Sequence, residues 1–132
     1  MKTSELLGAA LGYACAIAGG INPKTIHLNP KPTGQGTRQG IWLGDINGML
    51  TSWAPWRVWN QGGPIIEREH IQVSPSRQWL VCHTEHKWAA VNFKSSADAT
   101  NFQHGPTPLI AAMRCFAISK LGDEIELPQE LK

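Results

Sequence analysis

Cysteine is scarce in this sequence, and the few that occur are badly placed for pairing. Cys15, Cys82 and Cys115 are odd in number, lie far apart and form no CxxC pair. Small disulfide-stapled domains carry even numbers of closely spaced cysteines, so this spacing argues against a disulfide framework and favours a reducing compartment.

The chain also has no large excess of basic over acidic residues, or of acidic over basic ones. Twelve basic and ten acidic residues leave a formal net charge of +2, and the basic residues are scattered along the chain. Proteins that bind nucleic acid through its phosphates usually carry a basic stripe or tail. A nucleic-acid partner is therefore not expected.

Long hydrophobic runs are absent, so no segment approaches the length of a membrane span and no membrane partner is expected. The opening residues, MKTSELLGAALGYACAIAGG, share one lysine and several small residues with a secretory signal. Glu5 and Gly8 interrupt the apolar stretch, however, which favours an ordinary helix and leaves the signal as the alternative.

The chain has the length of one domain, residues 1–132. Its first helix is predicted to begin at Thr3 or Ser4 and to end before Gly19. A second, better marked helix has Thr107 as N-cap and Pro108 in its first turn. Polar-apolar patterning predicts strands at residues 26–28, 41–43, 65–66, 71–73, 79–83, 87–93 and 125–127. The predicted fold class is α+β: two helices packed on a small, mostly antiparallel sheet, with a long loop-rich segment over residues 22–62.

Two stretches combine turns, apolar runs and charges within a few positions: WNQGGPIIERE at 59–69 and GPTPLIAAMRCFAISK at 105–120. The Gly62-Gly63-Pro64 run is interpreted as a turn that delivers the chain into a strand. In that strand, Glu67 and Glu69 would share one face and Arg68 would lie on the other.

Five residues of these stretches form a candidate ligand-binding set. Trp59 can stack on a planar ligand while Gln61 hydrogen-bonds its edge, and Glu67 can accept a hydrogen bond. Arg114, in an apolar helical setting, can bind a phosphate or carboxylate, assisted by Thr107 at the helix start. The structural alternatives are a solvated strand face for Glu67, an ion pair of Arg114 with a nearby glutamate, and simple helix capping by Thr107.

QGGPIIERE at 61–69 and GPTPLIAAMRCFAISKLGDEIELP at 105–128 resemble the NinX-like family of phage proteins, and so does the N-terminal helix. Two departures are visible: Tyr13 stands where the family usually has tryptophan, and LTSWAPW at 50–56 lacks the acidic residue of the usual lead into the motif. The resemblance implies a phage or prophage accessory protein in the host bacterial cytoplasm. It implies no established activity.

We therefore expect a non-enzymatic module, without metal or cofactor, that binds a small anionic, planar, nucleotide-like molecule, for example to sequester a host defence signal. One alternative is a protein-interaction module that binds a host factor through Trp53, Trp56 and Trp59. Another is a small nucleotide hydrolase. The oligomeric state stays open, a homo-oligomer included.

Two further patterns are weaker pointers to chemistry. Cys82, His83, Glu85 and His86 have side chains that bind zinc, but no second ligand pair accompanies them. TGQGTRQG at 33–40 is glycine-rich like a phosphate loop but lacks the GK[ST] ending.

Overall fold

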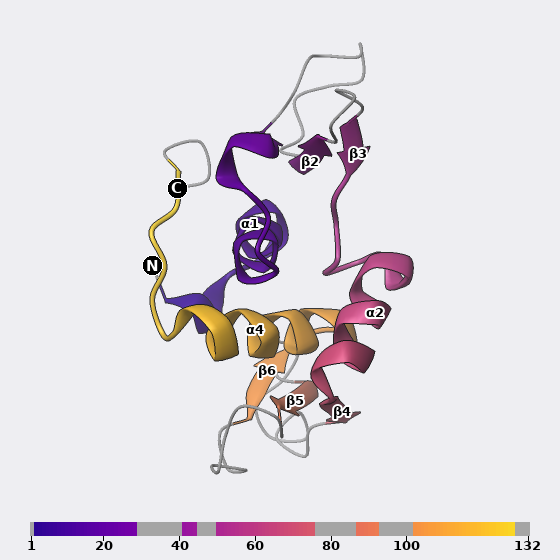
Figure 1. The fold of residues 1–132 in the computed structure, drawn as a ribbon. Helices are drawn as coiled ribbons and strands as arrows, with labels where there is room; N and C mark the ends of the chain where they lie inside the picture. The colour runs from indigo at the N-terminus through magenta and orange to yellow at the C-terminus, as the bar shows by residue number, and fades with distance from the viewer. Residues whose placement is uncertain (1, 29–40, 45–49, 76–86, 93–101, 129–132) are drawn as a thin grey trace.

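The computed structural model describes residues 2–28, 41–44, 50–75, 87–92 and 102–128 (Figure 1). The helical segments among them are η1 (Thr3–Glu5), α1 (Gly8–Ala18), η2 (Pro23–Thr25), α2 (Trp59–Glu69) and α4 (Pro108–Leu121). The strands are β1 (Ile26–Leu28), β2 (Ile41–Gly44), β3 (Leu50–Ser52), β4 (Ile71–Pro75), β5 (Trp88–Asn92) and β6 (Gln103–Gly105). The predicted α+β class is confirmed.

The strands form two small antiparallel sheets, with the orders β1-β2-β3 and β4-β5-β6, where one sheet was predicted. The strands predicted at 26–28, 41–43, 71–73 and 87–93 are confirmed in position. β3 and β6 are not predicted, because their sequences LTS and QHG lack the apolar–polar–apolar alternation of Ile26-His27-Leu28. The strand predicted at 79–83 lies outside the described residues.

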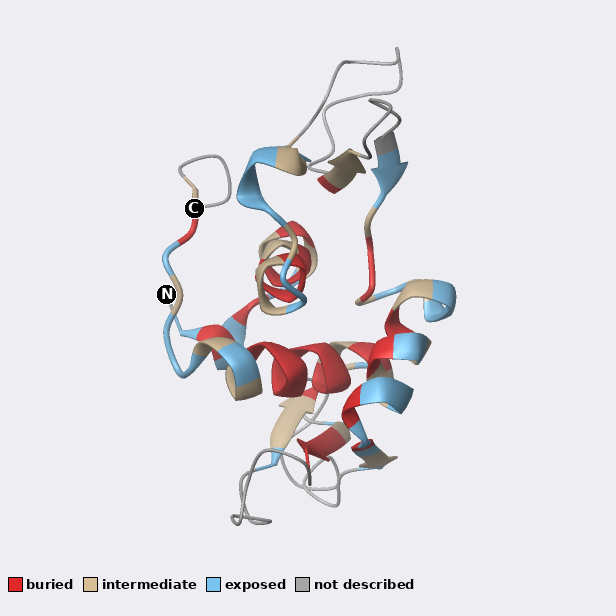
Figure 2. Cartoon of the chain, viewed as in Figure 1, coloured by how far each residue is buried: buried red, intermediate tan, exposed pale blue. Residues whose placement is uncertain are grey.

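Helix α4 is the centre of the molecule. It packs against α1 on one side and against β4, β5 and β6 on the other, with α2 alongside (Figure 1). Every residue from 111 to 117 is buried, so the helix is covered all round and has no solvent face along its middle (Figure 2). Three alanines, Ala111, Ala112 and Ala117, allow its neighbours to approach closely.

The N-terminal helix begins later than predicted. Neither Thr3 nor Ser4 caps it: the short η1 turn comes first, and α1 starts at Gly8, whose φ is 54°. The Thr3 side chain is buried and donates instead to the carbonyl of Gly122, 2.8 Å away. The Thr3 hydroxyl, which the local pattern predicts as a helix cap, thus bonds to the residue that ends α4 instead.

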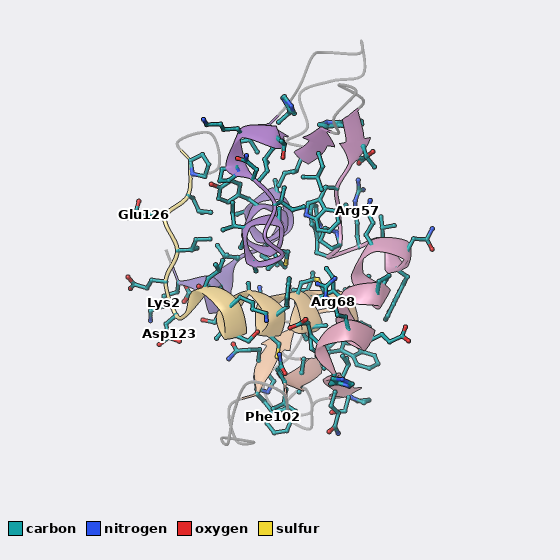
Figure 3. All side chains as sticks on the ribbon, viewed as in Figure 1. Lys2, Arg57, Arg68, Phe102, Asp123 and Glu126 are labelled. Atoms are coloured by element: carbon teal, nitrogen blue, oxygen red, sulfur yellow. The ribbon has the colours of Figure 1, made fainter. Side chains whose placement is uncertain are left out.

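The two ends of the described chain lie side by side, and Figure 3 shows Lys2 close to Asp123. The amide of Thr3 donates to the carbonyl of Asp123 at 2.8 Å, and Lys2 forms an isolated antiparallel bridge with Glu124. The closing strand predicted at 125–127 is therefore wrong: the bridge is at Glu124, and residues 125–127 belong to no strand. Leu127 is nevertheless buried in the core.

Residues 59–69 form a helix, so the predicted Gly-Gly-Pro turn and the strand entered at 65–66 are wrong. Gly62, Ile65 and Glu69 are buried, and their spacing of three and four residues is that of one helical face. Pro64 lies inside the helix, where it removes one backbone donor. The helix ends at His70, which adopts the left-handed conformation with φ 55°.

Tertiary packing explains why this glycine-rich stretch is helical. A Cβ at Gly62 would overlap the carbonyl oxygen of Pro55 and come within 2.6 Å of a methyl carbon of Leu109. Only glycine lets α2 approach both the preceding turn and the start of α4 so closely. The glycine that looked like a turn former is a close-packing residue.

Candidate functional site

The two sequence motifs meet in space, because α2 and α4 pack against each other (Figure 1). At one end of the contact Gly62 lies against Leu109. At the other end, the Lys120 ammonium lies 3.1 Å from Oε1 of Glu69. Residues about 50 positions apart in the chain are thus in contact along most of both helices.

A pocket of about 110 Å³ opens beside this contact, between the end of α1 and the facing sides of α2 and α4. Its lining is mostly apolar or aromatic and includes one charged residue. The lining residues are Cys15, Gly19, Ile21, Trp53, Ile65, Arg68 and Phe116. A cavity of about 150 Å³ holds one benzene ring in a well-studied engineered protein, so this smaller pocket can take in at most one ring or a similar group.

Arg68 supplies the charge of the pocket. Its side chain is 56% exposed, and its guanidinium carbon lies 5.8 Å from the centroid of the Phe116 ring, within cation–π range. Its Nε donates to Oε2 of Glu69 at 3.2 Å. Figure 3 shows Arg68 where α2 faces α4. The guanidinium is thus placed between an aromatic face and a carboxylate while it remains accessible to water.

Glu69 links two cations at the contact between the helices. Its side chain is only 8% exposed, and its two oxygens accept separately from Arg68 and from Lys120. Lys120 itself is 45% exposed. A helical period places Glu69 inward and Glu67 outward, so the prediction that both glutamates share one face is wrong.

The remaining walls of the pocket are held by hydrogen bonds. The indole Nε1 of Trp53 donates to the carbonyl of Gly12 at 3.0 Å, and the thiol of Cys15 donates to the carbonyl of Met113 at 3.6 Å. Each bond reaches a neighbouring helix. The aromatic and thiol walls are therefore fixed before any ligand arrives.

None of the five predicted ligand-binding residues lines this pocket. Trp59 is 57% exposed at the first position of α2, and Glu67 is exposed further along the same helix. Gln61 uses both ends of its amide at 2.6 Å: Oε1 accepts from the amide of Ala54, and Nε2 donates to the carbonyl of Ser52. Gln61 thereby ties α2 to the segment after β3.

The other two predicted residues belong to α4. Thr107 accepts from the amide of Ile110 at 3.1 Å, so the capping interpretation is confirmed. Arg114 is 8% exposed, and its Nε and one terminal nitrogen donate to the carbonyls of Leu6 at 3.0 Å and His104 at 2.7 Å. These bonds tie the end of η1, β6 and α4 together.

The residue that sequence reasoning missed is Arg68, the cation of the pocket. Strand alternation predicts it on the face opposite Glu67 and Glu69, and it is not among the predicted ligand-binding residues. Gly62, Ile65 and Glu69 are buried at the spacing of one helical face. A helix with that face inward places Arg68 beside it.

Both described cysteines are predicted to be nearly inert in the folded protein. Burial raises the pKa of the Cys115 thiol from 9.0 to about 12, and it raises that of Cys15 further still. At pH 8 the thiolate fraction of Cys115 then falls about thousandfold. In a Cys82→Ser variant we expect Ellman's reagent to react with both thiols only after denaturant is added. Rapid reaction of the folded variant would contradict this packing.

Metal binding finds no support among the parts of the chain that the structure describes, where no three His, Cys, Asp or Glu residues gather. The candidate ligands Cys82, His83, Glu85 and His86, and the glycine-rich stretch at 33–40, lie outside those parts.

Comparison with known proteins identifies one family. The family model described as Bacteriophage P22, NinX matches residues 2–120, which include both motifs and every pocket-lining residue. No match was found among the curated proteins. Within the described ranges, no helix combines the length and the hydrophobicity that crossing a bilayer requires.

Proposed function

The chain belongs to the bacteriophage P22 NinX family of phage accessory proteins, and on that premise we propose that it is a non-enzymatic binding module. Its ligand is a small, planar, nucleotide-like anion bound at the pocket between α1, α2 and α4. Sequestration of such a molecule in the host cytoplasm, for example a defence signal, is the use we propose. Arg68, rather than Arg114, is the anion-binding group.

The observation that carries this proposal is the position of Arg68 in an aromatic and apolar lining. A flat ring against the partly exposed Trp53 would gain apolar contact, and the guanidinium of Arg68 would bind the negative group. The proposal also accounts for the tight WNQGGPIIERE motif, because its helical packing is what turns Arg68 toward the pocket.

The pocket volume limits what can enter. Sites that enclose a whole drug-sized ligand measure about 300–1,000 Å³, and this pocket measures about 110 Å³. We therefore place only a ring inside it and the remaining part of the ligand at its mouth. Among the described lining residues one is charged, which favours binding over acid–base catalysis by two groups.

Calorimetric titration with uridine 2′,3′-cyclic monophosphate and uridine 5′-monophosphate, with neutral uridine as control, tests the proposal. We expect the nucleotides to bind more tightly than uridine. Loss of a charge-assisted hydrogen bond of about 1.5–3 kcal/mol should make Arg68→Ala at least about tenfold weaker.

Arg57→Ala is the matched control, because it removes the same charge from an exposed position away from the pocket (Figure 3). It should bind within about twofold of the unmodified protein, as surface charges away from a site contribute little. Nucleotide binding no tighter than that of uridine, or equal binding by Arg68→Ala, would reject the proposed function.

A second candidate function rests on Trp59, which is the most exposed of the large hydrophobic residues that the structure describes. An exposed tryptophan is a common anchor in protein interfaces, so a module that binds a host protein stays a proposal. Trp53 and Trp56 pack partly against the core, which reduces the three-tryptophan anchor to Trp59. Loss of a host-protein complex in Trp59→Ala, but not in Arg68→Ala, would support this function over the first.

A further inference from the structure

We infer that the pocket discriminates nucleotide-like ligands by the size of the base: it accepts the single ring of a pyrimidine and disfavours the two fused rings of a purine. The residue that determines this specificity is Ile65. The inference rests on the proposed function and names the class of base that its ligand carries. It follows from the volume of the pocket and from the way its walls are held.

The volume of the pocket is the first observation. It measures about 110 Å³. This is less than the cavity of about 150 Å³ that holds one benzene ring, so the two fused rings of a purine cannot enter whole. A pyrimidine has the ring size of benzene, and the edge that carries its sugar stays at the mouth in any case. A pyrimidine base therefore meets the volume limit and a purine base exceeds it.

The walls of the pocket resist widening. The Trp53 indole donates to the carbonyl of Gly12 at 3.0 Å, and the Cys15 thiol donates to the carbonyl of Met113 at 3.6 Å. A second ring between these walls would break such bonds or push side chains out of their preferred rotamers, and both changes cost free energy. The volume limit thus applies to the bound state as well.

Ile65 is the buried wall on the α2 side. It is 4% exposed, whereas Arg68, the other α2 residue in the described lining, has a side chain that is 56% exposed. Gly62, on the same helical face as Ile65, packs closely against Pro55 and Leu109. The backbone that carries Ile65 is thereby held in place, so the length of the Ile65 side chain limits the space for the base.

A purine nucleotide would lose one of two favourable contacts. If its six-membered ring entered, the five-membered ring would lie at the mouth and carry the sugar and phosphate outward, away from Arg68 in the lining. If the phosphate kept its contact with Arg68, the base would stay outside the pocket. Contact between one base and an aromatic side chain changes affinity about tenfold, so the loss is large enough to measure.

Calorimetric titration with uridine 5′-monophosphate and adenosine 5′-monophosphate tests the inference, because the two ligands share sugar and phosphate and differ in the base. We expect the unmodified protein to bind the uridine nucleotide about tenfold more tightly. Ile65→Ala shortens the wall, and a truncated core side chain leaves space because its surroundings relax only partially. This variant should lose most of the preference, chiefly by binding the adenosine nucleotide more tightly.

Ile71→Ala is the matched control. It removes the same atoms from another buried isoleucine, which is 6% exposed on β4 and is not among the described residues of the lining. A general loss of stability weakens both nucleotides alike, so this variant should keep the ratio of the two affinities. Ile65→Val is a milder truncation that serves if Ile65→Ala fails to fold, and it should lower the ratio in the same direction.

Equal or tighter binding of the adenosine nucleotide by the unmodified protein overturns the inference. So does a ratio that the folded Ile65 variants leave unchanged. In both cases the proposed function still stands if Arg68→Ala weakens binding of the uridine nucleotide. If neither nucleotide binds more tightly than its neutral nucleoside, the proposed function fails first and the inference fails with it.

Discussion

Arg114→Ala is expected to lower the free energy of unfolding by about 4 kcal/mol. The guanidinium is buried and donates to the carbonyls of Leu6 and His104. Hydrogen bonds from charged groups contribute about 1.5–3 kcal/mol each, and the two carbonyls would lose these donors. Urea denaturation followed by tryptophan fluorescence measures the change, because the midpoint scales with stability.

Two variants separate the causes of that loss. Arg114→Met keeps an unbranched stem but no donor, so it should recover the part of the loss that comes from packing. Arg57→Ala, at an exposed position, should change stability by less than about 0.5 kcal/mol. If Arg114→Ala instead keeps full stability and loses nucleotide affinity, Arg114 is a ligand-binding residue, as the sequence suggested, and the assignment to Arg68 is wrong.

Alanine at two adjacent glycines of α2 should change stability in opposite directions. A Cβ at position 62 would overlap the carbonyl of Pro55 and approach Leu109 to 2.6 Å, whereas a Cβ at position 63 meets nothing within 4 Å. Overpacking costs about 1–3 kcal/mol, so we expect Gly62→Ala to destabilise the protein by about 2 kcal/mol. Gly63→Ala should stabilise it by about 0.5–1 kcal/mol, the helix-propensity difference between the two residues.

The pair is its own control, because the same atom is added at neighbouring positions of one helix. Thermal and urea unfolding of both variants give the comparison. If the Gly-Gly-Pro run were a turn with left-handed glycines, alanine would destabilise at both positions. Destabilisation by Gly63→Ala would therefore contradict the helix at residues 59–69.

The sequence predicts which two motifs form the candidate site, but it does not predict which arginine lines the pocket. The WNQGGPIIERE and GPTPLIAAMRCFAISK motifs hold all five predicted ligand-binding residues, and the two motifs pack against each other. The choice between their arginines is not predictable from the sequence. The sequence does not show that Arg114 faces main-chain carbonyls while Arg68 faces an aromatic pocket. That difference depends on the rotation of each helix against its neighbours.

The sequence by itself determined α4 and several short strands. Thr107 and Pro108 start that helix and Gly122 ends it through bonds within a few residues, so local chemistry is sufficient. The family was likewise predicted from the motifs alone.

Only the tertiary structure decided that residues 59–69 form a helix. Locally, two glycines and a proline disfavour a helix, and no polar side chain caps its start. Two contacts outweigh that preference: Gly62 is buried against Pro55 and Leu109, and Glu69 pairs with Lys120. Their partners come from other segments of the chain, so the local sequence does not show them. Glu69 is thereby turned inward, and Arg68 is placed at the pocket on which the proposed function rests.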